Sequence, residues 1–451
     1  MKYSKFLKKR MMKIKKEKKK KKKLLKLILD DVKEAKKIMK YSNTPLSPAF
    51  ISDELLAEIL SFLDVKNIVQ LKCVSKSWNT LISDPTFVEK HLKKSSQKPR
   101  LLLTPRCWTY PIASVKSFPV RHLVKNPSST VCFPLRGYNC SKYPISSRYK
   151  VVNSYNGLLC LLFISLNMNY NIETCSFCLW NPATRTKSVE FGTFKEAYNP
   201  RSLFDSLEFI FGCDILNGIY KVIAFQAERD NGDALWRCQV RVLSLGDNCW
   251  RNINSFPVIP LISPYNNGVH LSGTVSWLAL QKHLSPLYNY MYINHVEKFV
   301  IVSLDLSTEE YTQFLLPSGF FGVPCFQPTL QVLMDCLCFS YDLWKTEFVI
   351  WQMKEFGIQD SWTQLCRIKY FNLEMRVSFF ESSTPVLLPL YLSKNENTLI
   401  LADCVDDQTI IYNQRKNRVE RIKNSNKVCR FSHIDSLVST HLKYVFLYHL
   451  Q

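Results

Sequence analysis

The sequence predicts two parts of different fold class: a small all-α segment, and then a mainly-β domain that most simply forms a β-propeller-like fold. Four short helix patterns lie between Ile51 and Leu92, the first of them predicted from Ile51 to Lys66. After Arg100, short apolar runs rich in β-branched and aromatic residues alternate with turn residues, as in all-β folds. A β-sandwich is the alternative, because it also consists of short strands at regular spacing.

Each predicted helix is preceded by a start signal. Ser52, Asp64 and Ser75 can each accept a hydrogen bond from the first turn of the helix that follows. Asp84 precedes a proline, which suits the first turn of a fourth helix. Apolar residues surround much of the first helix, and a unit this small cannot bury all of them internally. The segment therefore predicts a surface that a partner covers, in the manner of a helix bound in a groove.

A weak repeat runs through the strand-rich domain. In each copy, a hairpin is followed by a strand that ends in a polar turn and then by a closing segment. The anchor residues of that strand are spaced 63, 61, 47 and 61 residues apart: Trp180, Leu243, Leu304, Trp351 and Tyr412. About four strands within such a period suit the blades of a propeller. Residues 101–150 can supply a further blade or a closing strand.

Positive charge is concentrated at the N-terminal end. The chain has a net charge of +23, and residues 1–40 hold nineteen basic and four acidic residues, a net charge of +15. The run "KKEKKKKKKLLK" predicts a nuclear localisation signal or a weak, non-specific contact with polyanions; the alternative is a solvated, disordered extension without function. We expect a basic tail, disordered or helical, over residues 1–44, followed by the helical domain at 45–95 and the β-domain at 96–450.

Composition and spacing argue against several classes of protein. No run of about eighteen apolar residues is present, so no membrane span is expected. No secretory signal is visible, so we interpret the 16 cysteines as free thiols and expect the protein in the nucleus, the cytoplasm or both. Cys175 and Cys178 form a CxxC pair without further ligands, and no second CxxC accompanies them.

Enzyme signatures are also missing from the sequence. We find no G-x-S-x-G, no glycine-rich phosphate loop and no H-E-x-x-H, so we expect no catalytic residues, no metal and no cofactor. His270, beside a Ser-Gly turn, is interpreted as a hairpin residue; the alternative is a ligand that faces a central channel. The stretch "WNPATRTK" is interpreted as a turn between strands, with a target-contacting loop as the alternative.

The helical segment resembles an F-box motif. The positions that fall on the family pattern are Leu55, Leu56, Ile59, Leu60, Leu63, Lys66, Leu71, Cys73, Val74, Lys76, Trp78, Leu81 and Ile82. Ser52 and Asp64 stand where the family has proline, so the packing of those prolines against a partner is lost. The resemblance implies binding to a Skp-type linker subunit, and through it to a cullin. The residues implied in linker binding are Ile51, Ser52, Leu55, Leu56, Ile59, Leu60, Leu63, Asp64, Leu71, Val74, Trp78, Leu81 and Ile82.

The β-domain resembles the F-box-associated, kelch-like domain of the large plant F-box family. Stretches such as "YNGLLCL", "LWNPATRTK" and "IVSLDLSTEEYTQFLLP" carry this resemblance over roughly residues 100–420. The chain has no Gly-Gly doublet, so it is not a standard kelch array. The resemblance implies a substrate-recognition adaptor of an SCF ubiquitin ligase, which recruits an unidentified target protein for ubiquitination and degradation. The alternative is a non-ligase propeller scaffold with a degenerate F-box. No target-binding residue can be predicted.

Overall fold

The structure is a computed structural model, and it describes most of the chain after Ile51. The predicted basic tail at 1–44, the next residues up to 50, and Ile51 itself lie outside the described residues. The described ranges are 52–105, 115–125, 133–134, 147–167, 172–197, 207–229, 236–262, 268–281, 284–375, 386–393, 395, 397–423 and 427–440.

Four short helices form the first described part, as the sequence predicts. They are α2 (Asp53–Leu60), α3 (Val65–Leu71), α4 (Lys76–Ser83) and α5 (Pro85–Ser95). The first helix is shorter than predicted, because its last turn tightens: the amide of Phe62 bonds the carbonyl of Ile59, and that of Leu63 bonds Leu60. Such tight turns commonly end helices, and α3 begins anew after Asp64.

The described β-domain consists of six antiparallel sheets. The first contains β4 (Ser147–Tyr155), β5 (Leu158–Asn167), β6 (Ile172–Asn181), β7 (Thr186–Lys187) and β8 (Phe191–Ala197). The second contains β9 (Leu207–Asp214), β10 (Ile219–Arg229), β11 (Trp236–Ser244) and β12 (Trp250–Ile253), and the third contains β13 (Ile259–Pro260), β14 (Val269–Leu271), β15 (Thr274–Leu280), β16 (Phe299–Asp305) and β17 (Tyr311–Phe314). The fourth contains β18 (Thr329–Leu333), β19 (Cys336–Leu343), β20 (Glu347–Met353) and β21 (Trp362–Lys369), and the fifth contains β22 (Leu387–Leu392), β23 (Thr398–Asp403), β24 (Gln408–Asn413) and β25 (Arg418–Lys423). The sixth joins β26 (Lys427–His433) to β1 (Arg100–Pro105), β2 (Lys116–Pro119) and β3 (Phe133–Pro134), with the helix α6 (Val120–Lys125) after β2.

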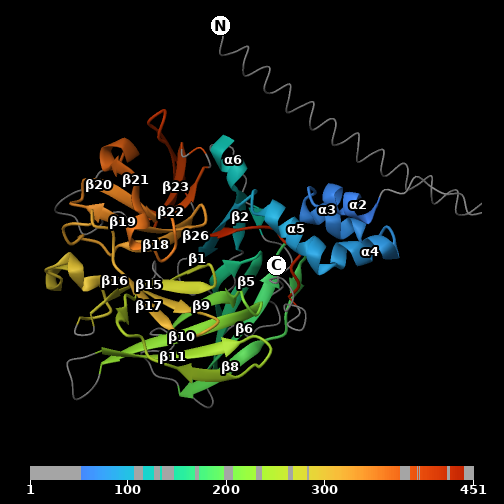
Figure 1. Ribbon diagram of the computed structural model, residues 1–451, viewed down its shortest axis with the longest axis horizontal. Coiled ribbons are helices and arrows are strands. Elements are labelled where there is room, and N and C mark those ends of the chain that lie inside the picture. The colour runs from blue at the N-terminus through green and yellow to red at the C-terminus, as the bar shows by residue number, and fades with distance from the viewer. Residues whose placement is uncertain are drawn as a thin grey trace, which may run out of the picture. The chain divides into compact units, whose positions relative to one another are not determined.

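These sheets are the blades of a six-bladed β-propeller, numbered here one to six in the order just given (Figure 1). The inner strand of each blade contacts the inner strand of the next, from β4 to β9, β14, β18, β22 and β26, and β26 contacts β4 again. In blade three the inner strand is β14, which pairs with β15. Inner strands that meet in a closed circle are the mark of a propeller. The propeller prediction is therefore confirmed, and the sandwich alternative is wrong.

The ring closes through the C-terminal strand. β26 pairs antiparallel with β1, so that His433 lies opposite Arg100 and Ser432 opposite Leu101. Residues 101–150 thus contribute strands to the sixth blade, as the sequence allowed, but the innermost strand of that blade comes from the other end of the chain. Pairing strands from both ends removes the exposed edges that an open sheet would leave.

The sequence repeat corresponds to one strand of each of the first five blades. Its anchors lie in the third strands β6, β11, β16, β20 and β24. Four of the five are buried, and they face the preceding blade: Leu304 clusters with Phe225 of blade two, and Tyr412 clusters with Phe348 of blade four. Between blades two and three, for example, Phe256 meets Phe225 and Trp277 edge to face, with ring centroids 5.3 and 5.0 Å apart. This geometry suits aromatic quadrupoles and fills the space between sheets.

Candidate functional site

The helix caps that the sequence predicts largely form. The Ser52 hydroxyl accepts a hydrogen bond from the amide of Leu55 at 3.4 Å, and Ser75 accepts from Trp78 at 3.1 Å. The Asp84 carboxylate accepts from the amide of Thr86 at 2.8 Å. These bonds satisfy amides that have no partner within their own helix, so three of the four helix starts are set by local sequence.

Asp64 is the exception, and its predicted cap is wrong. Its backbone carbonyl accepts hydrogen bonds from Asn67 and Ile68, but its side chain makes no capping bond. The carboxylate instead lies 3.2 Å from the ammonium of Lys98, beyond the end of α5. Both side chains are largely exposed, so this ion pair contributes little to stability.

The predicted linker-binding residues differ in exposure, and the differences divide them by role. Leu56, Leu60 and Ile82 are buried within the chain and support the helices. Ser52, Leu55 and Asp64 are exposed, and Leu55 exposes 53% of its surface. The others are half-buried: Ile59, Leu63, Leu71, Val74, Trp78 and Leu81.

Phe62 is an apolar surface residue that the family pattern did not select. It exposes 49% of its surface, and the Lys94 ammonium lies 3.4 Å from the centre of its ring. Its signal in the sequence is an aromatic residue placed between Ile59 and Leu63, off the buried side of the helix. We refer to exposed Leu55 and Phe62, with the half-buried residues named above, as the helical docking surface.

Polar contacts between α2 and α5 hold this surface in place. Glu58 pairs with Lys90 at 2.6 Å and also with Lys94, and these hydrogen bonds lower the pKa of its carboxyl. His91 is buried, with Nε2 3.0 Å from the carbonyl of Leu63. Burial lowers the pKa of His91, so the imidazole is neutral near pH 7 and suits an apolar interior.

His270 and the stretch "WNPATRTK", which the sequence singles out in the propeller, bond to neighbouring residues of the chain. His270 is enclosed between inner strands: its Nε2 lies 3.0 Å from the Cys213 carbonyl, and its ring meets Tyr155 edge-on at 4.5 Å. The stretch "WNPATRTK" is a turn, in which the side-chain Oδ1 of Asn181 accepts hydrogen bonds from the amides of Ala183 and Thr184 at 3.0 and 3.2 Å. His270 is thus held by the backbone of blade two, whereas Arg185, Thr186 and Lys187 of the turn remain exposed.

The tryptophans and cysteines of the propeller were the remaining candidates for binding a partner or a metal. Trp180, Trp277 and Trp362 are buried in the core, as the sequence predicts, and Trp250 and Trp351 are half-buried. The twelve cysteines whose side chains are described carry no disulfide. Among the described residues, no three His, Cys, Asp or Glu side chains converge as metal ligands would, and no helix there has the length and hydropathy needed to cross a membrane.

Comparison with known proteins agrees with both parts of this structure. Residues 51–90 match the F-box domain, and residues 136–423 match the F-box associated beta propeller domain. An F-box/kelch-repeat protein of Arabidopsis thaliana is 25% identical over 349 residues, which cover 76% of this chain and 86% of that protein. A second F-box protein of that plant is 25% identical over 426 residues, covering 89% and 87% of the two chains.

Two further comparisons extend this picture. The F-box protein CPR1 of Arabidopsis thaliana is 24% identical over 399 residues, which cover 79% of this chain and 86% of that protein. A solved structure, cobalt-substituted ACO of Synechocystis, covers 75% of this chain and 72% of its own with a TM-score of 0.35 at 9% identity, too distant a likeness to carry an inference. The two domain matches together cover well over half of the sequence. The chain therefore belongs to the plant F-box proteins that carry an F-box-associated β-propeller domain.

Proposed function

We propose that this protein is a substrate-recognition adaptor of an SCF ubiquitin ligase. The helical docking surface binds a Skp-type linker subunit, and through it a cullin, while the propeller holds a target protein for ubiquitination and degradation. The observation that carries the proposal is the exposure of Leu55 and Phe62 on capped, well-formed helices. Large apolar side chains exposed together on a small helical unit mark an interaction surface.

The proposal includes no catalytic step in this chain. F-box proteins are generally non-catalytic adaptors, and ubiquitin transfer belongs to other subunits of the ligase. We also propose that the protein works in the nucleus, the cytoplasm or both, which the lysine-rich N-terminal run supports as a localisation signal.

Binding of the full chain to a purified plant Skp-type linker tests the proposal. We expect the natural protein to bind, and Leu55→Asp to weaken binding by about 30-fold or more, because a charge would be desolvated at the centre of an apolar contact. Isothermal titration calorimetry measures both affinities. Since Leu55 is exposed in the free chain, the variant should keep its thermal unfolding midpoint.

Leu216→Asp is the matched control, because Leu216 is equally an exposed leucine but lies in a propeller turn. This variant should bind the linker as the natural protein does. If the natural protein fails to bind a linker that binds another F-box protein, the adaptor proposal is wrong.

A degenerate F-box on a propeller scaffold is the second candidate. The observation that favours it is Asp64, which stands at a family proline position, makes no capping bond with its side chain and is largely exposed beside Lys98. Replacing Ser52 and Asp64 together with proline distinguishes the two candidates. Linker binding that appears only in this double variant would favour the scaffold, whereas comparable binding by both proteins would favour the adaptor.

A further inference from the structure

Exposed apolar side chains of the propeller gather on one face. In each blade, turns between the first and second and between the third and fourth strands lie at one face, because antiparallel strands alternate in direction. Turns between the second and third strands, and the segments that join blades, lie at the opposite face, which we call the bc face. Of the thirteen large apolar side chains exposed in the described propeller, eight lie there: Leu287, Tyr290, Met291, Tyr292, Leu315, Phe321, Trp344 and Phe371.

All eight belong to blades three and four, and contacts join the segments that carry seven of them. The hydroxyl of Tyr288, in the β15–β16 connection, donates to the carbonyl of Pro324, in the β17–β18 connection. Phe321 in that second segment lies 5.7 Å from Trp344, measured between ring centroids. The Lys345 ammonium lies 5.8 Å from the ring of Phe326. Contacts therefore join the three segments that carry seven of the exposed residues, and we call all eight residues the apolar strip.

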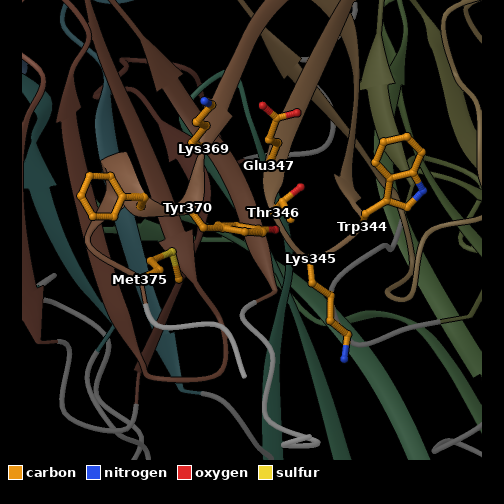
Figure 2. Close-up of a pocket in the computed structure, with 8 residues that line it drawn as sticks. Trp344, Lys345, Thr346, Glu347, Lys369, Tyr370 and Met375 are labelled. Atoms are coloured by element: carbon orange, nitrogen blue, oxygen red, sulfur yellow. The ribbon is translucent and has the colours of Figure 1, made fainter. Parts of the chain in front are cut away.

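A groove of about 590 Å³ opens in this strip beside blade four (Figure 2). Trp344, in the tight turn between β19 and β20, lies on one side and Met375 on the other, with Tyr370 between them. Phe371 also lines the groove. Trp344 and Phe371 expose 58% and 86% of their surfaces. Rigid aromatic side chains around a groove are the features that anchor binding partners.

Tyr370 forms a fixed floor for the groove. Its side chain is buried, and its hydroxyl donates to the carboxylate of Asp342 at 2.8 Å. The same carboxylate accepts from the amide of Lys345 at 3.1 Å, which shapes the turn that carries Trp344. The floor and one wall are therefore tied to a single buried carboxylate, so the groove is formed before any partner binds.

The groove has a positive character. Its lining includes Lys345 and Lys369, whose side chains point to opposite sides of Tyr370 in Figure 2. The one carboxylate in the lining, Glu347, is neutralised by Arg367, whose Nε donates to it at 2.6 Å. Among the described residues, no carboxylate lies within ion-pair distance of Lys345 or Lys369. The Asp342 carboxylate offsets part of the charge of Lys345. Two lysines without an ion-pair partner among the described residues, beside apolar walls, still favour an anionic and apolar ligand.

The geometry points to a groove for an acidic, apolar segment of the target protein. We infer that an apolar side chain of an extended target segment lies over Tyr370 between Trp344 and Phe371, with carboxylates on either side facing Lys345 and Lys369. This inference rests on the adaptor function proposed above and names the chemistry of its target. The groove lies at the face opposite the point where the chain enters the propeller, which is the start of β1, the second strand of blade six.

Labelled nine-residue peptides test the inference by fluorescence anisotropy with the full chain. Each peptide has a central leucine or serine, flanked on both sides by glutamate, glutamine or lysine. We expect the Glu-Leu-Glu peptide to bind at least tenfold more tightly than its Gln, Lys and serine counterparts. Trp344→Ala and Phe371→Ala should each weaken that binding about tenfold, because both residues are exposed and removable without disturbing the core.

A charge reversal separates this groove from the lysine-rich tail as the source of binding. The variant Lys345→Glu with Lys369→Glu should prefer the Lys-flanked peptide, reversing the natural preference. Lys416→Glu and Met334→Ala are matched controls, because both residues are exposed on the opposite face. These controls should bind as the natural protein does.

The inference is overturned if no peptide binds at up to about 1 mM, if Glu- and Lys-flanked peptides bind equally, or if the reversal variant keeps the natural preference. Linker binding is measured on the same variants and should be unchanged. Loss of peptide preference with intact linker binding refutes the groove alone. A chain that binds peptides as expected but never the linker refutes the adaptor role alone.

Discussion

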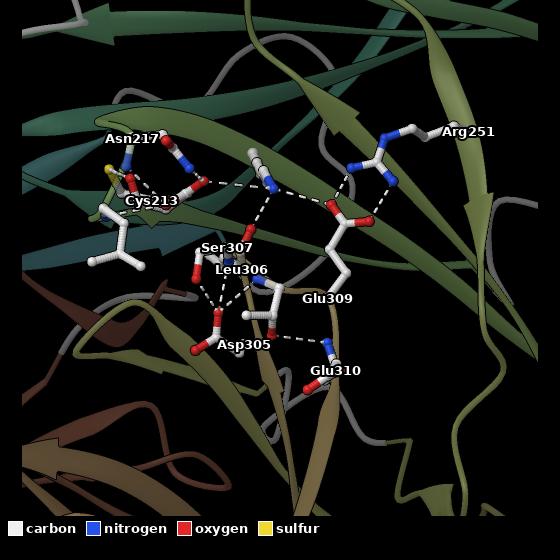
Figure 3. Close-up of polar contacts among 12 residues, drawn as sticks. Cys213, Asn217, Arg251, Asp305, Leu306, Ser307, Glu309 and Glu310 are labelled. Carbon is white, nitrogen blue, oxygen red and sulfur yellow. Dashed lines mark hydrogen bonds and ion pairs between the residues drawn. The ribbon is translucent and has the colours of Figure 1, made fainter.

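Lys221 in β10 carries a buried positive charge that joins two blades through Glu309, which Figure 3 shows beside Arg251. Its ammonium donates to Glu309 at 3.0 Å and to the carbonyl of Leu306, both in the turn after β16 in blade three. Arg251 also donates to Glu309. Burial alone would raise the pKa of Glu309, but the hydrogen bonds and charges of Arg251 and Lys221 outweigh it and lower the pKa. Each buried charge is thereby compensated, which is the condition for tolerating it.

Two buried histidines make the propeller sensitive to acid. Burial lowers the pKa of His270 to about 4. Burial and the positive charge of Arg100 lower the pKa of His433 to about 3, and Nδ1 of His433 lies 2.9 Å from the Ser154 hydroxyl. Both imidazoles are therefore neutral in the folded protein, where unfolded histidine would begin to take up protons below about pH 6.5.

From pH 7 to pH 5 we expect the free energy of unfolding to fall by about 2 kcal/mol for each of these histidines. The sign follows from linkage: in this window the unfolded chain binds more protons, so stability is full above pH 6.5 and is lost as pH falls toward the folded pKa. Urea denaturation at the two pH values measures the change.

The variant His433→Gln should show a smaller loss between pH 7 and pH 5, by about 2 kcal/mol. His295→Gln is the control, because His295 is exposed, and it should follow the natural protein. An identical pH dependence of His433→Gln and the natural protein would contradict this account of the acid sensitivity.

At the scale of single elements, a polar residue at the end of a strand shapes several turns. Asn181 ends β6, Asp305 ends β16 and Asn413 ends β24, and each accepts hydrogen bonds from amides two or three residues further on. Such turns follow directly from local sequence. Asn181 does more, because its amide also donates to the carbonyls of Ser436 and Val438 at 3.1 and 2.8 Å. It thereby holds the segment that follows the closing strand.

Replacing Asn181 with alanine should lower the free energy of unfolding by about 3 kcal/mol. The side chain is fully buried, and its loss leaves two carbonyls and two amides without their partner. Urea denaturation at pH 7 measures the loss. Asn413→Ala removes an equivalent turn residue that is only half-buried and should cost less than about 1 kcal/mol. Equal losses in the two variants would show that the contact with residues 436–438 does not stabilise the ring.

At the scale of the whole molecule, ring closure is the feature on which the propeller depends. β26 is the inner strand of blade six, and it pairs with β1 and contacts the inner strands of both neighbouring blades. Leu101, Leu102 and Leu103 of β1 are buried in this arrangement. Without β26 these side chains and a full strand edge would meet water.

Deleting residues 427–451 should therefore abolish the single cooperative thermal transition, with a loss of about 5 kcal/mol or more, comparable to the whole stability of many domains. Circular dichroism of the tryptophan side chains, recorded during heating, measures whether the thermal transition is single and cooperative. Deletion of residues 441–451 alone is the control, since it keeps β26 and the contacts of Asn181. If both deletions unfold at the natural midpoint, closure by β26 is not needed for stability.

Much of the architecture could be read from local pattern. Ser75 and Asp84 start their helices as predicted, and the anchors from Trp180 to Tyr412 do lie in equivalent strands of five blades. These features depend on hydrogen bonds within a turn or on the alternation of one strand, so nearby residues are sufficient to specify them. The predicted family and the division into helices and strands follow from the same signals.

Other features depend on segments far apart in the chain, and local pattern could not supply them. The closing role of β26, the burial of Leu56 beside exposed Leu55, and the pairing of Asp64 with Lys98 are examples. So is the aromatic groove of blade four, because Trp344 and Phe371 come together only when two connections meet on the bc face. Short-range hydrogen bonding and periodicity thus specify the elements, while long-range packing decides which side chains remain at the surface to bind other proteins.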